Sequence, residues 1–97
     1  MLTHIVVWKY KPETSETERN EHVQRLRALA PVIPEVLSLT VGRDVLHLAR
    51  SYDTGLVATF HDRAGLDAYT VHPTHEEVAA MGRGISQHVA SVDFEDE

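Results

Sequence analysis

The sequence predicts a single α+β domain over residues 1–97, with the element order β-α-β-β-α-β. Three observations support this prediction. Four short runs rich in β-branched or aromatic residues are typical of strands. Two segments between them repeat apolar residues at helical spacing. The length of 97 residues fits one domain.

The first strand is expected over Leu2–Tyr10, just before a proline. Alternate residues of a strand point to opposite faces of the sheet. One face therefore carries the even-numbered residues, and the other carries Thr3, Ile5, Val7 and Lys9. Both sets contain apolar residues in the middle of the strand, so both faces need cover.

The first helix is expected to begin after Ser15, because Ser15 and Glu18 form an S-x-x-E capping box. Pro31 and Pro34 are expected to end it. Its inward-facing residues recur at helical spacing: His22, Val23, Leu26, Leu29, Ala30 and Ile33.

Strands are also expected over residues 36–41, Thr54–Phe60 and 87–94, with a long polar loop over 44–53. Asp62 can cap a short helix over 63–69, and Pro73 suits the first turn of another helix. The acidic run 93–97 is expected to be a solvated tail. The inner stripe of the last helix comprises His75, Val78, Ala79, Gly82 and Ile85.

This order is the ferredoxin-like plan, in which both helices cover one face of an antiparallel sheet. Ile5, Val7 and Val57 lie on the other face and are poor residues for contact with water. We therefore expect a homodimer in which two sheets pack face to face across a two-fold axis.

The composition argues against several function classes. The net charge is −6, and the nine Lys and Arg are scattered, so we expect no nucleic-acid partner. The chain has no cysteine, and therefore no disulfide or thiolate metal site. The apolar N-terminal run is too short to cross a membrane, and no signal-peptide pattern follows it. We expect a soluble cytoplasmic protein without a membrane partner.

The chain resembles the stress-responsive A/B barrel (Dabb) family over nearly its full length. The segments that carry the resemblance are 4–11 (HIVVWKYK), 33–36 (IPEV), 41–44 (VGRD), 51–53 (SYD), 56–60 (LVATF), Tyr69 with 72–75 (HPTH), and 92–94 (VDF). The resemblance implies a ferredoxin-like fold that dimerises into an α+β barrel.

Most members of this family have no assigned activity, but one is a plant polyketide cyclase. The resemblance to it implies functional positions at His4, Tyr69 and His75, in a pocket between the sheet and the helices. It also implies a pocket lining of Val6, Trp8, His22, Leu26, Leu56, Ala58, His72 and Val78. His22 and Leu26 stand where the cyclase has aromatic pocket residues, and Ser86 replaces a large residue, so the pocket here is expected to be more polar.

The residues themselves indicate acid–base chemistry. His4 and His75 both face the space between sheet and helices, with Tyr69 nearby. A histidine can remove a proton from a carbon acid near neutral pH, and a tyrosine hydroxyl can hold the resulting enolate oxygen. We therefore expect a small apolar ligand that bears a carbonyl group, with His75 as the base and no cofactor.

Other interpretations stay open. His72 is expected to be structural, as a helix N-cap; His75 can be a buried histidine that bonds a carbonyl, and Tyr69 a core residue. The chain is then a non-enzymatic, stable dimer of the stress-response type. A cofactor-free monooxygenase-like enzyme rests on fold analogy alone.

A metal site is a further alternative. His4, His22, His72 and His75 are enough imidazoles for one, although their spacing matches no zinc signature. His47, His61 and His88 are expected to face solvent.

Overall fold

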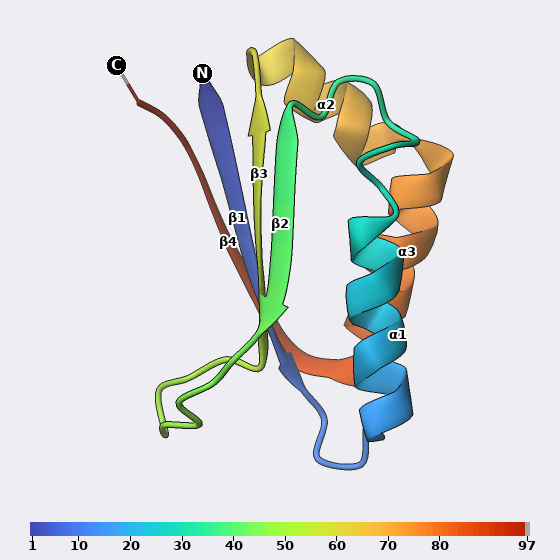
Figure 1. Cartoon of the computed structure of the whole chain (residues 1–97), viewed down its shortest axis with the longest axis vertical. Coiled ribbons are helices and arrows are strands. Elements are labelled where there is room, and N and C mark those ends of the chain that lie inside the picture. The colour runs from blue at the N-terminus through green and yellow to red at the C-terminus, as the bar shows by residue number, and fades with distance from the viewer. Residues whose placement is uncertain (97) are drawn as a thin grey trace.

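The structure is a computed structural model that describes residues 1–96. Its elements follow the predicted order, and the ferredoxin-like α+β fold is confirmed (Figure 1). They are β1 (Leu2–Tyr10), α1 (Glu16–Arg27), β2 (Ser38–Arg43), β3 (Thr54–Phe60), α2 (Arg63–Val71), α3 (Pro73–Ile85) and β4 (Ser86–Glu95).

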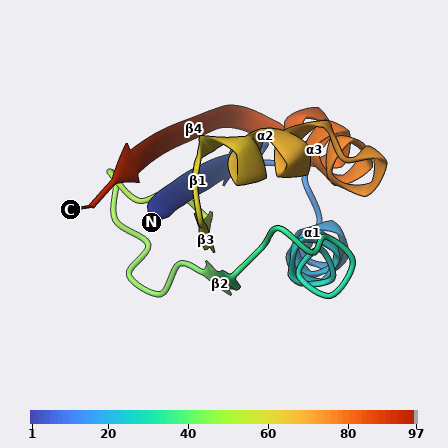
Figure 2. The same ribbon diagram turned by 90° about the horizontal axis from the view of Figure 1, so that it is seen from above.

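The four strands form one antiparallel sheet in the order β2-β3-β1-β4. All three helices lie on one side of this sheet, as two perpendicular views show (Figures 1 and 2). The loop between β2 and β3 projects away from the helices in both views. The sheet therefore has one face that the helices cover and one, here called the open face, that they leave uncovered.

The predicted helix caps are present. The Ser15 hydroxyl accepts a hydrogen bond from the amide of Glu18, and the Glu18 carboxylate accepts one from the amide of Ser15. Asp62 caps α2 by accepting from the amide of Gly65. These bonds satisfy amides that have no partner inside a helix, which explains where α1 and α2 begin.

The first helix ends at Arg27, several residues before Pro31 and Pro34, where the sequence predicted its end. Tight turns follow, in which the amides of Val32 and Ile33 donate to the carbonyl of Leu29. Leu29 and Ile33 are fully buried although they lie outside the regular helix. The apolar pattern therefore identified core residues correctly but overestimated the length of the helix.

The second strand lies two residues later than predicted, at Ser38–Arg43 rather than 36–41. The amide of Val36 bonds the carbonyl of Ile33 in a turn, so the strand cannot begin there. At its other end, Gly42 and Arg43 pair with β3 and extend the ladder.

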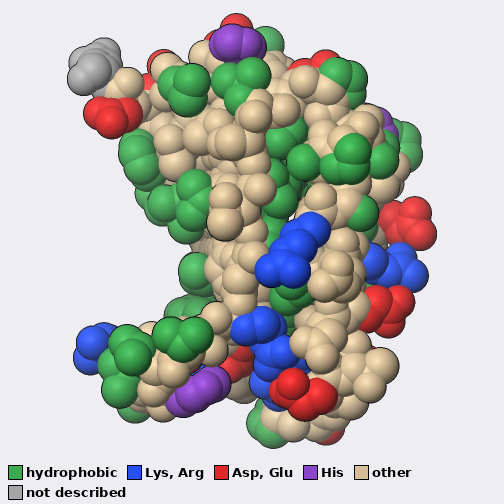
Figure 3. Space-filling model, viewed as in Figure 1, with side chains coloured by type: hydrophobic (Ala, Val, Ile, Leu, Met, Phe, Trp, Pro, Cys, Tyr) green, Lys and Arg blue, Asp and Glu red, His purple; other side chains and the backbone are tan. Residues whose placement is uncertain are grey.

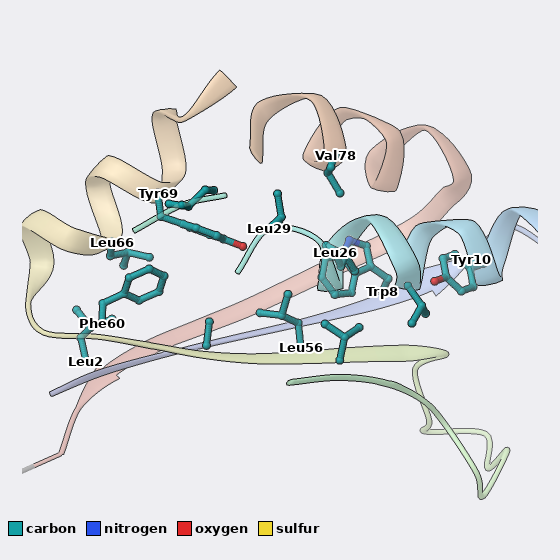
Figure 4. Close-up of a cluster of buried hydrophobic side chains, with 14 residues drawn as sticks. Leu2, Trp8, Tyr10, Leu26, Leu29, Leu56, Phe60, Leu66, Tyr69 and Val78 are labelled. Carbon is teal, nitrogen blue, oxygen red and sulfur yellow. The ribbon is translucent and has the colours of Figure 1, made fainter. Parts of the chain in front are cut away.

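The two faces of the sheet differ as the parity of β1 predicted. Trp8, Leu56 and Phe60 are buried beneath the helices (Figure 4). On the open face, Ile5 lies between Val57 of β3 and Val92 of β4. Val57 is 44% exposed and Val92 is 54% exposed. The open face thus carries a row of aliphatic side chains that this chain alone does not cover.

The outline of the molecule is hollowed on the side away from the helices, between the end of β4 and the β2–β3 loop (Figure 3). Two aliphatic side chains of that loop are largely exposed, Val45 at 82% and Leu46 at 67%.

No helix within residues 1–96 is long and apolar enough to cross a membrane.

Candidate functional site

A cleft of about 260 Å³ lies between the helix-covered face of the sheet and the helices, and is here called the central cleft. Part of its floor is a row across three strands, because Val6 lies opposite both Leu56 and Ser91. Its other lining residues are His4, Trp8, Leu26, Tyr69, Thr70, His75, Ala79, Arg83 and Val89. The three predicted functional residues, His4, Tyr69 and His75, therefore border one space.

His4 is held by a carboxylate that the sequence reasoning did not use. The β1–β4 register places Asp93 directly opposite His4, and His4 Nδ1 pairs with Asp93 Oδ1. Residue 93 was expected to belong to a solvated tail, but it lies within β4 on the same side of the sheet as His4. The contact with Asp93 orients the His4 ring, whose centroid is 5.9 Å from that of Tyr69.

His75 is oriented by the backbone of the preceding helix. Its Nδ1 lies 3.0 Å from the carbonyl oxygen of Thr70. Because a carbonyl can only accept, Nδ1 carries the hydrogen, and Nε2 is the basic atom of the neutral ring. Burial lowers the pKa of His75, although the hydrogen bond to Thr70 acts in the opposite direction. His75 is therefore a neutral base at pH 7.

Tyr69 reaches down from α2 into the space between the helices and the sheet, with its hydroxyl pointing away from Leu66 and Phe60 (Figure 4). Its ring lies against that of His75, with centroids 4.3 Å apart. Burial raises the pKa of Tyr69 to about 12. The hydroxyl therefore keeps its proton at pH 7 and is available as a hydrogen-bond donor.

Four residues predicted to line the pocket are not among the lining residues of the central cleft: His22, Ala58, His72 and Val78. Ala58 and Val78 are buried in the core, and their short side chains are covered by neighbours. His72 Nδ1 accepts a hydrogen bond from the amide of Thr74 and caps α3. The interpretation of His72 as a helix N-cap is confirmed.

His22 lies in the core rather than in the cleft. Its ring packs against Trp8 and Tyr10, with centroids 4.9 and 5.6 Å away. Nδ1 is 2.8 Å from the hydroxyl of Tyr10, which is 2.8 Å from Oγ1 of Thr54. Nε2 is buried without a hydrogen-bond partner. Burial lowers the pKa of His22 to about 4, so the ring is neutral at pH 7.

The histidines considered as metal ligands do not gather at one point. His4 and His75 border the cleft, whereas His22 and His72 have the separate environments described above. Residues 1–96 contain no group of three or more His, Cys, Asp or Glu side chains that could hold a metal ion. His47, His61 and His88 are exposed, as expected.

Five lining residues escaped the pocket prediction: Thr70, Ala79, Arg83, Val89 and Ser91. Val89 and Ser91 follow from the strand register, because they lie opposite Trp8 and Val6. Ala79 had been placed on the inner stripe of α3, next to His75. Arg83 carried no signal of its own, because a charged residue near the end of a helix is usually a solvated one.

A wider hollow of about 590 Å³ lies between α2 and the end of β4. Half of its eight lining residues are charged, with Arg63, Asp67 and Glu95 among them, and neither Tyr69 nor His75 borders it. Thr70 lines both spaces, and Asp93 of this hollow pairs with His4 of the central cleft. The central cleft is therefore the candidate site, because Tyr69 and His75 border it and not the wider hollow.

Comparison with known proteins finds similarity along nearly the whole chain. The family model described as the Stress Responsive A/B Barrel Domain matches residues 2–96. The olivetolic acid cyclase of Cannabis sativa is 23% identical over 95 residues, which cover 96% of this chain and 94% of the cyclase.

Solved structures show the same fold. A dimeric ferredoxin-like protein of unknown function from Jannaschia sp. CCS1 is 31% identical, with a TM-score of 0.83 and 98% coverage of both chains. A dimeric ferredoxin-like protein from Thermobifida fusca YX is 25% identical, with a TM-score of 0.87 over 96% of this chain and 88% of that one. The hydroxynitrile lyase of Passiflora edulis is 20% identical, with a TM-score of 0.86 over 96% and 90%.

Proposed function

Because the chain belongs to the stress responsive A/B barrel (Dabb) domain family, we propose that it is a homodimer that binds a small apolar carbonyl compound in each central cleft. We further propose that His75 and Tyr69 perform acid–base chemistry on this ligand. The observation that carries the proposal is the placement of a neutral histidine against a protonated tyrosine at one apolar cleft.

The cleft is suited to a small, mostly apolar molecule. Aliphatic and aromatic side chains such as Val6, Trp8 and Leu56 make up much of its lining, and a few polar groups converge on it. Small-molecule sites commonly combine an apolar wall with a few polar groups that orient the ligand. A ligand ring or alkyl chain lies against that wall, and its carbonyl oxygen lies toward Tyr69.

The proposed reaction step is proton transfer from a carbon next to the ligand carbonyl. His75 Nε2 takes the proton, and the electron pair of the C–H bond moves into the enolate. The Tyr69 hydroxyl donates a hydrogen bond to the enolate oxygen, where negative charge develops. His4, held by Asp93, acts as a positioning residue beside Tyr69. Two similar proteins, olivetolic acid cyclase and hydroxynitrile lyase, are named as enzymes. Their names support a catalytic role for this chain rather than ligand binding alone.

The dimer is proposed on separate grounds. The row Val57, Ile5 and Val92 covers the middle of the open face. A chain of this size has a thin core, so burying this row against a second copy adds stability. The structures from Jannaschia and Thermobifida are described as dimeric. The clefts lie on the opposite side of each sheet and stay accessible in such a dimer.

Binding of methyl 4-oxo-4-phenylbutanoate, a short aryl keto ester, tests the cleft assignment. Titration followed by NMR is expected to shift the backbone amides of Tyr69, Thr70 and Ala79. The Ala79→Phe variant places a ring in the cleft and is expected to weaken binding at least tenfold. The matched control is Ala80→Phe, on the exposed side of the same helix. Equal binding by both variants contradicts the assignment.

A further inference from the structure

Arg83 is the one residue with a permanent positive charge among those that line the central cleft. It stands in the last turn of α3, two turns after His75. No carboxylate lines the cleft within residues 1–96. The lining therefore combines apolar walls with a single permanent cation.

The other charged arginines of the helices and strands show what is unusual about Arg83. Arg25 pairs with Glu21, Arg43 with Glu16, and Arg63 with Asp67. Arg19 and Arg27 instead donate hydrogen bonds to backbone carbonyls. Arg83, by contrast, takes part in none of the ion pairs or side-chain hydrogen bonds formed in the part of the chain that the structure describes. Its guanidinium group keeps all of its donors for another partner.

The guanidinium lies close enough to the proposed base to affect it electrostatically. Burial is the main cause that lowers the pKa of His75. The hydrogen bond to Thr70 and the charge of Glu76 raise it, and His4 and, as the smallest contribution, Arg83 lower it. Arg83 and His75 thus act on the same space, and a ligand in contact with His75 lies within the field of Arg83.

We propose that the ligand of the central cleft is a monoanion, an apolar carbonyl compound that also bears a carboxylate, and that Arg83 binds this carboxylate at the cleft mouth. This inference rests on the proposed function, because it concerns the ligand of the same cleft. Guanidinium and carboxylate groups match in shape and form paired hydrogen bonds. One guanidinium balances the one negative charge of a monoanion. Polyanions such as phosphate esters are disfavoured, because the protein itself has a net charge of −6 and repels them.

A matched pair of probes separates the charge from the rest of the ligand. 4-Oxo-4-phenylbutanoate and its methyl ester share the ring and the ketone but differ in charge. Dissociation constants for both are measured with the wild-type protein at low ionic strength. The acid is expected to bind about tenfold more tightly than the ester, and this preference should shrink as salt is added.

Variants assign the preference to Arg83. Arg83→Gln is expected to bring the ratio of acid to ester affinity to about one, and Arg83→Lys to restore part of it. The control Arg25→Gln removes the same charge from the outer side of α1 and is expected to keep the wild-type ratio. A wild-type ratio near one, or a tenfold ratio that survives in Arg83→Gln, overturns the inference.

The two proposals fail differently. If the ester binds in the cleft but the acid shows no advantage, the inference about Arg83 is wrong and the proposed function stands. If neither probe shifts the amides of the cleft residues, the proposed function is wrong, and the inference about Arg83 falls with it.

Discussion

The rings of Tyr69 and His75 lie with their centroids 4.3 Å apart, and burial moves the pKa values of the two residues in opposite directions. Burial disfavours the charged form of each group, so His75 stays neutral and Tyr69 stays protonated at pH 7. One residue can therefore accept a proton while its neighbour donates a hydrogen bond. This division of roles is the physical basis of the acid–base proposal.

Tyr69→Phe removes the hydroxyl and keeps the ring. We expect the rate at which the protein exchanges α-protons of a ketone probe to fall about a hundredfold, because the donor to the enolate oxygen is lost. The unfolding free energy is expected to change by no more than about 1 kcal/mol. Proton NMR in D₂O measures the exchange. The control is Tyr52→Phe, since Tyr52 lies outside the central cleft, and an equal effect of both variants contradicts the role of Tyr69.

His22 makes the stability of the fold depend on pH. Its pKa is about 4 in the folded chain, against 6.5 when exposed, so the unfolded chain binds more protons between these values. The contribution of the neutral ring is complete above pH 6.5 and is lost as the pH falls toward 4. We expect a loss of roughly 3 kcal/mol of unfolding free energy from this residue across that window. Urea denaturation at several pH values measures it, and His22→Gln should flatten the profile. If the unfolding free energy of His22→Gln depended on pH as steeply as that of the wild type, groups other than His22 would be responsible for the dependence.

Gly82 brings α3 into close contact with the core. A Cβ atom at this position would lie 2.9 Å from both His22 Nε2 and Trp8 Nε1, whereas one at Gly84 would meet nothing within 4 Å. We therefore expect Gly82→Ala to destabilise the fold by about 1–3 kcal/mol through crowding. Gly84→Ala is expected to stabilise it by up to about 1 kcal/mol through helix propensity. Urea unfolding of the two variants compares them directly, and equal effects would mean that the contact at Gly82 is not tight.

The open face is expected to hold a second copy of the chain. Light scattering at micromolar concentration should give twice the chain mass of 10.9 kDa. Val57→Lys places a charge in the aliphatic row and is expected to shift the mass toward that of the monomer. Val71→Lys, at an exposed site at the end of α2, serves as the control and should stay dimeric. A wild-type monomer at this concentration would contradict the assignment of the open face.

Much of the fold could be predicted because its signals are local. The capping box at Ser15 and Glu18 marked the start of α1, and alternation along β1 placed His4, Val6 and Trp8 on the helix side. The end of α1 was less predictable. The turns after Arg27 keep Leu29 and Ile33 buried, so the apolar pattern continues after the helix has ended.

The candidate site was only partly predictable, because its remaining residues depend on distant pairing. Asp93 lies opposite His4 because of the register between β1 and β4, and this register cannot be read from the sequence of either strand alone. Arg83 differs from an ordinary surface arginine only through what lies beside it, a cleft without a carboxylate. His22 and Val78 share the inward-facing pattern of cleft residues, yet packing places them in the core.

The most direct test of the central claim is proton–deuterium exchange at the carbon next to the ketone of methyl 4-oxo-4-phenylbutanoate in D₂O. The wild-type protein should accelerate exchange above the buffer rate, with a half-maximal pH below 6.5, because the base works only when neutral. His75→Asn keeps a donor for the Thr70 carbonyl but has no basic nitrogen, and should reduce exchange to the buffer rate. His47→Asn alters an exposed histidine and should match the wild type. Equal exchange by the wild type and His75→Asn would show that His75 is not the base.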